Sequence, residues 1–189
     1  MDSMNEITPH PFAVETPAKF SAREFIRMKE IGAFEGMKVE LVAGDIIRTN
    51  PPYIGHGAKQ AVMIWQLADA YEGVHVVVAD ETGVQLDANT IRSFDAVVVR
   101  DAPVDMKLLD PAFVILAVEI ADTTLDRDLG PKMREYAAAG IPEYWVVDAN
   151  KKRVHVMRSP KGEKYAYSKI MHFGEQMKPP GGIKAVMVI

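Results

Sequence analysis

The sequence contains no cysteine among its 189 residues. Disulfide bonds and thiolate metal sites are therefore excluded, and any bound metal must be held by oxygen atoms or imidazole nitrogens. The five histidines do not have the spacing of a zinc site, so hard cations are favoured. The chain also lacks an apolar run of about 18 residues, and residues 1–16 do not resemble a signal sequence. We therefore expect a cytoplasmic protein with no membrane contact.

The proportions of apolar and charged residues are those of an ordinary folded protein. Hydrophobic residues make up 48% of the chain and charged residues 25%, which differs from the composition of disordered chains. No internal repeat, low-complexity segment or proline-rich linker divides the sequence. We therefore predict an N-terminal extension over residues 1–18, followed by one folded domain over residues 19–189.

Charge is distributed unevenly along the chain. The net charge is −4, yet residues 150–189 contain nine Lys or Arg and two Glu, a local charge of +7 that leaves −11 on residues 1–149. A basic segment beside an acidic body is consistent with a surface that faces phosphate groups next to a metal site. A solvated β-hairpin without a binding role explains the same charges equally well.

The hydrophobic pattern of the first half predicts two helices and several short strands. Ser21 and Glu24 have the spacing of a capping box, which places a first helix over residues 21–31. A longer helix is predicted over residues 55–72, with Trp65 on its core-facing side. Strands are predicted for the β-rich segments at 39–42, 46–47, 74–78, 82–86 and 94–99.

The second half contains the segments expected at the centre of a sheet. Residues 113–120 form an apolar run with one carboxylate, typical of a strand buried on both faces. Asp128 is predicted to cap a helix that ends at Gly140. Further strands are predicted at 143–147, with Trp145 in the core, and at 154–157, 164–168 and 185–189. The predicted fold class is α/β: a mixed β-sheet flanked by helices, with additional β-hairpins.

Glu119 is an unusual residue for a strand that is otherwise Val, Leu and Ile. A buried carboxylate costs several kcal/mol unless it is paired or bound to a metal. Asp95 leads into another apolar strand, and neighbouring strands could bring these two carboxylates together. Lys132 follows Glu119 by 13 positions, after one loop and part of a helix. A Glu119–Lys132 ion pair and a divalent-metal site held by both acids explain this pattern equally well.

A longer motif around these residues resembles a known family. Residues 118–125 (VEIADTTL) are followed by Asp128 and Lys132, and then by residues 136–148 (YAAAGIPEYWVVD). Upstream, residues 40–45 (ELVAGD), His56 and Asp95 extend the pattern over nearly the whole chain. Together they resemble the Uma2 family of bacterial proteins, also called DUF820. That family has the PD-(D/E)XK restriction-endonuclease-like fold.

This resemblance implies a nuclease site that uses Mg²⁺, for which Mn²⁺ can substitute. A metal-activated water would attack a phosphodiester in line, and Lys132 would position that water. The residues implied for catalysis are Glu40, Asp95, Glu119 and Lys132. The implied metal ligands are Asp95, Glu119 and Ile120, the last through its carbonyl oxygen. His56, at the start of the second helix, would contact the substrate; a polar helix end without that role is the alternative.

Two positions depart from the family pattern. The usual lysine stands two residues after the acid on the same strand, where this sequence has Ala121. The resemblance therefore implies that Lys132 supplies the lysine from the following helix. Phe94 stands where the family often has proline, a change that affects backbone stiffness more than chemistry.

The expected function is a Mg²⁺-dependent endonuclease acting on DNA or a related nucleic acid. A homodimer is expected because cutting both strands of a duplex needs two sites. An alternative is a non-catalytic, nucleic-acid-associated binding module that retains the nuclease fold, and a third possibility is a metal-dependent hydrolase of nucleotides. No helix-turn-helix or zinc-finger motif is recognisable, so specificity would come from loops or from a partner.

Overall fold

A computed structural model describes residues 16–50, 53–103 and 105–188. Residues 1–15 of the predicted N-terminal extension lie outside the described residues. The helices are α1 (Ala22–Glu30), α2 (Ile54–Ala70), α3 (Leu125–Arg127) and α4 (Met133–Ala138), with a 3-10 turn η1 (Pro111–Phe113) and a π-helical turn η2 (Asp128–Lys132). No helix in these ranges is long and apolar enough to cross a membrane.

Six strands form the larger sheet, in the order β10-β9-β8-β7-β6-β3. Their bounds are β3 (Val77–Asp80), β6 (Ala96–Val99), β7 (Val114–Ala121), β8 (Glu143–Asp148), β9 (Arg153–Lys161) and β10 (Lys164–His172). Strands β7 and β8 pair in parallel, and the other pairings are antiparallel. The chain crosses from β7 to β8 through α3, η2 and α4, so these two strands end at the same edge of the sheet.

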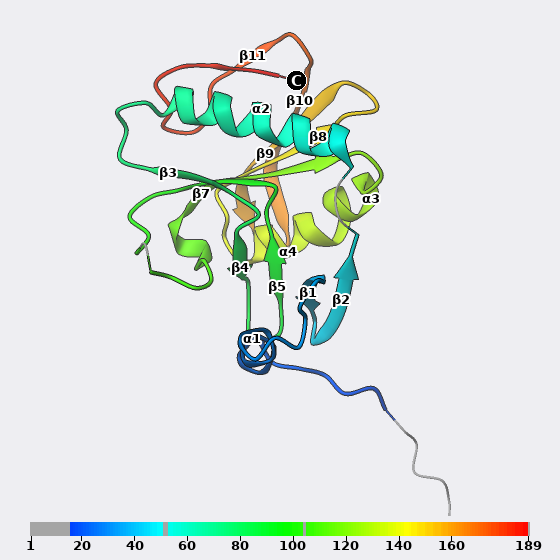
Figure 1. Ribbon diagram of the computed structural model, residues 1–189. Coiled ribbons are helices and arrows are strands. Elements are labelled where there is room, and N and C mark those ends of the chain that lie inside the picture. The colour runs from blue at the N-terminus through cyan, green and yellow to red at the C-terminus, as the bar shows by residue number, and fades with distance from the viewer. Residues whose placement is uncertain (1–15, 51–52, 104, 189) are drawn as a thin grey trace, which may run out of the picture.

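Helices cover both faces of this sheet (Figure 1). Helix α2 packs Met63 and Leu67 against one face, which includes Val118 and Ile120 of β7. Helix α4 packs Tyr136 against the opposite face, which includes Ala117 and Ala121 of the same strand. Because side chains alternate along a strand, Glu119 lies on the α4 side. The prediction of a central strand buried on both faces is confirmed.

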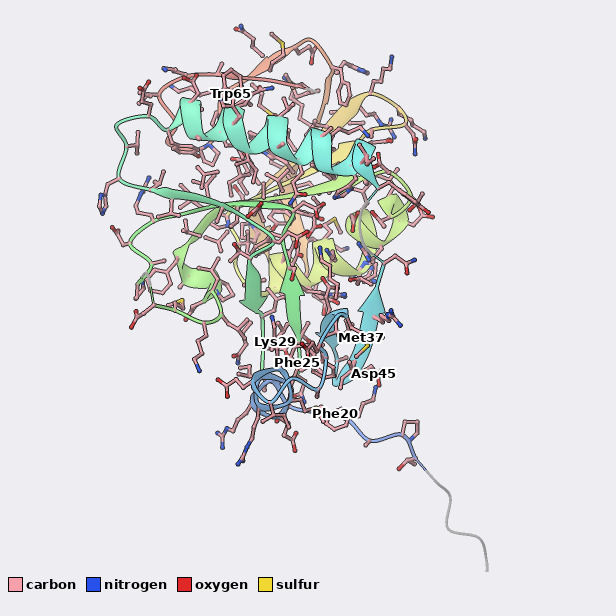
Figure 2. All side chains as sticks on the ribbon, viewed as in Figure 1. Phe20, Phe25, Lys29, Met37, Asp45 and Trp65 are labelled. Carbon is pink, nitrogen blue, oxygen red and sulfur yellow. The ribbon has the colours of Figure 1, made fainter. Side chains whose placement is uncertain are left out.

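A four-stranded sheet and a small hairpin complete the fold. The four-stranded sheet has the order β2-β1-β5-β4. Its bounds are β1 (Lys38–Val42), β2 (Asp45–Thr49), β4 (Gly83–Gln85) and β5 (Ile91–Ser93), and the hairpin pairs β11 (Gln176–Met177) with β12 (Val186–Met187). Phe25 of α1 packs against this sheet, at the lower end of the molecule in Figure 2. The link Phe94–Asp95 carries the chain from β5 to β6 of the larger sheet.

Most predicted elements are present close to their predicted bounds. The capping box of Ser21 and Glu24 is formed at the start of α1, and α2 matches the longer predicted helix. The strands predicted at 39–42 and 46–47 are present as β1 and β2, which pair as a hairpin. Gly140 follows α4 with φ 79°, as expected for the residue that ends this helix. Strand β5 has no counterpart among the predicted strands, because three residues are too few to show an alternating pattern.

Two predictions are wrong. Asp128 does not cap a helix, because the helix begins at Leu125 and Asp128 is buried inside η2. The prolyl nitrogen of Pro131 carries no hydrogen for an α-helical bond, consistent with the wider π-turn there. Trp65 is 70% exposed on the outer side of α2 (Figure 2), two positions from the buried Met63, whereas Trp145 is buried as predicted. The strand predicted at 185–189 is present as β12, which pairs with β11.

Candidate functional site

Glu119 accepts two hydrogen bonds from the segment that connects β7 to β8, one from η2 and one from α4. Lys132 Nζ lies 2.8 Å from Glu119 Oε1, and the Tyr136 hydroxyl donates to the same oxygen at 2.7 Å. Burial raises the pKa of Glu119 to about 8, against the opposing effect of the Lys132 charge. Lys132 and Tyr136 share a helix face because they are four positions apart. The Glu119–Lys132 contact predicted as one of two alternatives is therefore formed.

Lys132 is the positive centre of a buried cluster. Its side chain is 2% exposed, lies 3.9 Å from Glu40 Oε1 and donates to the Ser93 carbonyl at 3.4 Å. Burial lowers the pKa of Lys132, but the nearby charges of Glu119 and Glu40 outweigh this effect and raise it overall. The ammonium group therefore stays charged at neutral pH.

Glu40 reaches this cluster from the smaller sheet. Strand β1 lies between β2 and β5, so Glu40 is not on an edge strand, and it is 4% exposed. Arg92 Nη1 donates to Glu40 at 3.0 Å, and the Ser93 amide donates at 3.1 Å. Burial raises the pKa of Glu40, but Lys132 and Arg92 together hold it below its ordinary value. Arg92 also binds both carboxylate oxygens of Glu135 on α4, at 2.7 and 2.8 Å.

Asp95 lies in the link between the two sheets, beside Glu119. Its Oδ2 accepts a hydrogen bond of 2.7 Å from the backbone amide of Ile120, the residue that follows Glu119. Its carbonyl oxygen accepts from Gln60 Nε2 of α2 at 2.8 Å. Burial raises the pKa of Asp95, but the hydrogen bonds from His56 and Ile120 lower it overall. Asp95 is therefore ionised at neutral pH.

His56 stands between two carboxylates at the start of α2. Its Nε2 is 3.4 Å from Asp95 Oδ1 and its Nδ1 is 3.6 Å from Asp122 Oδ2. Lys59 Nζ binds the other oxygen of Asp122 at 3.0 Å. The hydrogen bond with Asp95 raises the pKa of His56. The first turn of α2 thus places a basic imidazole next to Asp95.

Asp95 and Glu119 supply the type of oxygen donor that a hard divalent cation prefers. Both described hydrogen bonds to Glu119 end on Oε1, which leaves Oε2 for another ligand. Within the described ranges no group of three or more His, Cys, Asp or Glu side chains is spaced to hold a metal. Mg²⁺ commonly uses one or two carboxylates and takes its remaining ligands from water and substrate phosphate. Asp95 and Glu119 supply two carboxylates of this kind.

The structure brings together the residues that the sequence singled out, and adds others. Glu40, Asp95, Glu119, Lys132 and His56 all lie in one connected network of contacts. Arg92 and Asp122 also join this network, although neither was predicted as a site residue. A charged residue on a short strand or in a loop is ordinarily exposed, so their contacts in the network could not be expected. Gln60 could have been found, because His56, Gln60, Met63 and Leu67 recur at the spacing of one helix face.

Arg127 adds positive charge next to the cluster. Its Nε lies 3.2 Å from Asp128 Oδ1, and its side chain is 40% exposed while Asp128 is buried. Burial lowers the pKa of Arg127, but the charges of Asp128, Glu119 and Glu40 raise it overall. The arginine therefore borders the buried acids on one side and solvent on the other.

Comparisons with known proteins agree on the fold and the family. None of the curated proteins compared matches the chain. A solved structure described as "a putative nuclease belonging to DUF820", from Anabaena variabilis, superposes with a TM-score of 0.67. It shares 14% sequence identity, and the match covers 85% of this chain and 89% of that chain, so it shows a common fold. The model of the Uma2 family, described as "putative restriction endonuclease", matches residues 22–186, and the chain therefore belongs to the Uma2 family.

Proposed function

We propose that this protein is a Mg²⁺-dependent endonuclease that hydrolyses phosphodiester bonds in DNA. The observation that carries the proposal is the position of Asp95 against the backbone of β7, next to Glu119, with the Lys132 ammonium 2.8 Å from Glu119. Asp95, Glu119 and the Ile120 carbonyl would hold Mg²⁺, or Mn²⁺ in its place. Bound there, the cation would neutralise phosphate charge and lower the pKa of a coordinated water.

The protein groups have separate roles in this proposal. Lys132 would orient the attacking water and offset charge on the phosphate, because its ammonium is fixed by Glu119, Glu40 and the Ser93 carbonyl. Glu40 would hold Lys132 in place from the other sheet. His56 would contact a substrate phosphate, since its raised pKa favours the positively charged imidazolium.

Cleavage of supercoiled plasmid DNA tests this function. We expect wild-type protein to nick plasmid with Mg²⁺ or Mn²⁺ and to be inactive in EDTA. Glu119→Gln and Lys132→Ala should abolish cleavage, because they remove the carboxylate and the ammonium. Glu143→Gln is the matched control, since Glu143 is also buried but pairs with Arg158 outside this cluster. Equal cleavage by wild type and both site variants would refute the proposal.

One observation favours a second function, a nucleic-acid-binding module without turnover. Glu119 is already compensated by Lys132 and Tyr136, so the fold does not depend on a metal to bury it. Such a module would bind DNA equally well in EDTA and would never nick it. A rise in melting temperature with Mn²⁺ in wild type, absent in Glu119→Gln, would favour the enzyme. Sedimentation velocity would test the proposed homodimer.

A further inference from the structure

The turn between β8 and β9 contains a lysine in a backbone conformation that suits glycine. Asp148 ends β8 and pairs with Arg153 at the start of β9, with residues 149–152 between them. Lys152 has φ 49°, in the left-handed region that side chains with a Cβ rarely adopt. Strained residues of this kind persist where the surroundings hold them, often at functional sites.

Three hydrogen bonds hold this turn in place. The Lys151 amide donates to Asp148 Oδ1 at 3.1 Å, and the Phe173 amide donates to the Lys152 carbonyl at 3.0 Å. Asn150 Nδ2 donates to the Asp122 carbonyl at 2.5 Å. The backbone is therefore fixed at both ends of the turn, while the two lysine side chains are exposed.

The third of these bonds connects the turn to the candidate site. Asp122 directly follows β7, and its carboxylate contacts Lys59 and His56 of α2. His56 in turn contacts Asp95. Figure 1 shows the end of β8 at the same side of the molecule as α3 and the first turn of α2. The turn thus lies at the edge of the sheet where β7 and β8 end, beside residues of the candidate site.

The positive charges of this turn are not neutralised by neighbouring acids. Among the described residues, Lys151 and Lys152 have no salt bridge. Three cations of the same basic segment are paired with acids: Arg153 with Asp148, Arg158 with Glu143, and Lys184 with Asp69 and Glu72. Within the described ranges Lys161, Lys164, Lys169 and Lys178 are also unpaired, so it is the position beside the candidate site that sets Lys151 and Lys152 apart. The turn therefore presents two free ammonium groups beside a site that we propose cuts a polyanion.

We propose that Lys151 and Lys152 bind backbone phosphates of the nucleic acid beside the cleavage site. This inference rests on the proposed function and identifies where the flanking part of the substrate lies. Lysine contacts to phosphate are independent of base sequence and release condensed counterions. The hydrogen-bonded turn holds the backbone of both lysines beside the site, so that their exposed side chains can reach phosphates next to it.

Lys152→Gly separates the charge from the backbone strain. Glycine fits φ 49°, so this variant should be as stable as wild type or melt at a higher temperature. Binding of a short fluorescent DNA duplex in EDTA should nevertheless weaken, by roughly 8-fold at about 0.1 M salt for each phosphate group that the variant no longer binds. Between about 50 and 200 mM salt, the slope of log affinity against log salt should become shallower by about 0.9. The double variant Lys151→Ala/Lys152→Gly should reduce that slope by about twice as much.

Lys161→Ala and Lys164→Ala are the matched controls. These exposed lysines flank the far end of the β9–β10 hairpin, a nine-residue strand or about 30 Å from Lys152. They should leave the affinity and the salt slope unchanged. Two results would overturn this inference and leave the proposed function intact. In the first, wild type binds DNA and Lys152→Gly binds it with the same affinity. In the second, the control variants lose as much DNA affinity as Lys152→Gly. Wild-type protein that binds no DNA would overturn both.

Discussion

Replacing Lys132 with methionine tests the buried charge cluster without any substrate. Lys132 and Glu119 are each 2% exposed, and methionine keeps an unbranched apolar chain of similar length while removing the charge. Removing one partner of a buried ion pair costs about 3 to 5 kcal/mol, because the other charge is left without compensation. We expect Lys132→Met to lose stability by this amount at alkaline pH.

The stability that Lys132→Met loses should depend on pH, and the pKa of Glu119 determines whether this loss grows or shrinks as the pH rises. Burial raises this pKa from 4.5 to about 8, so the folded state holds a proton that the unfolded state has released. Wild-type stability from this group therefore falls as the pH rises from 4.5 to about 8. Without Lys132 the folded-state pKa rises further, since the main group that lowers it is gone. Above about pH 8 the difference in unfolding free energy between wild type and Lys132→Met should therefore widen. The increase should be about 1.4 kcal/mol for each pH unit over which Glu119 is ionised in folded wild type but not in the folded variant.

Urea unfolding in EDTA at about pH 6, 7.5 and 9 measures this gap. Lys184→Met is the control, because Lys184 pairs with Asp69 and Glu72 at the surface and its removal should produce no such pH dependence. A gap between wild type and Lys132→Met that stays constant or narrows as the pH rises would refute the electrostatic account of this cluster.

Three further substitutions test other contacts by urea unfolding. Tyr136→Phe removes the hydroxyl that donates to Glu119 but keeps the ring, and should cost about 1 to 2 kcal/mol; no loss would mean that this bond contributes nothing. Ser21→Ala removes the side chain that caps α1 and pairs with Glu24, and should cost about 1 kcal/mol, whereas an unchanged midpoint would contradict a formed capping box. Trp65→Ser should change stability little because the indole is 70% exposed, and a loss of several kcal/mol would show that it is buried in solution.

The sequence was informative where a residue conflicted with its surroundings. Glu119 in an apolar strand and Lys132 on the next helix predicted a contact that the structure forms at 2.8 Å. The same pattern could not separate an ion pair from a metal site, because both place the lysine and the acid together. The proposed metal site would also use the Ile120 carbonyl, and a backbone carbonyl carries no sequence signal.

Other features depend on the assembled fold and could not be predicted locally. Asp128 has the residue type of a helix cap, yet the π-turn around Pro131 buries it inside the helix. Arg92 of β5 contacts Glu40 of β1, which is 52 positions away in the chain, and Glu135 of α4, which is 43 positions away. No local pattern relates residues so far apart.

The link Phe94–Asp95 has a consequence for how the site responds to motion. Glu40 belongs to one sheet and Glu119 to the other, while Asp95 lies where the chain passes between them. The Lys132–Glu119 distance of 2.8 Å joins η2 to β7 of the larger sheet, whereas the Lys132–Glu40 distance of 3.9 Å joins η2 to β1 of the smaller sheet. A small rotation of the smaller sheet relative to the larger one would therefore change the Lys132–Glu40 distance and leave the Lys132–Glu119 distance as it is.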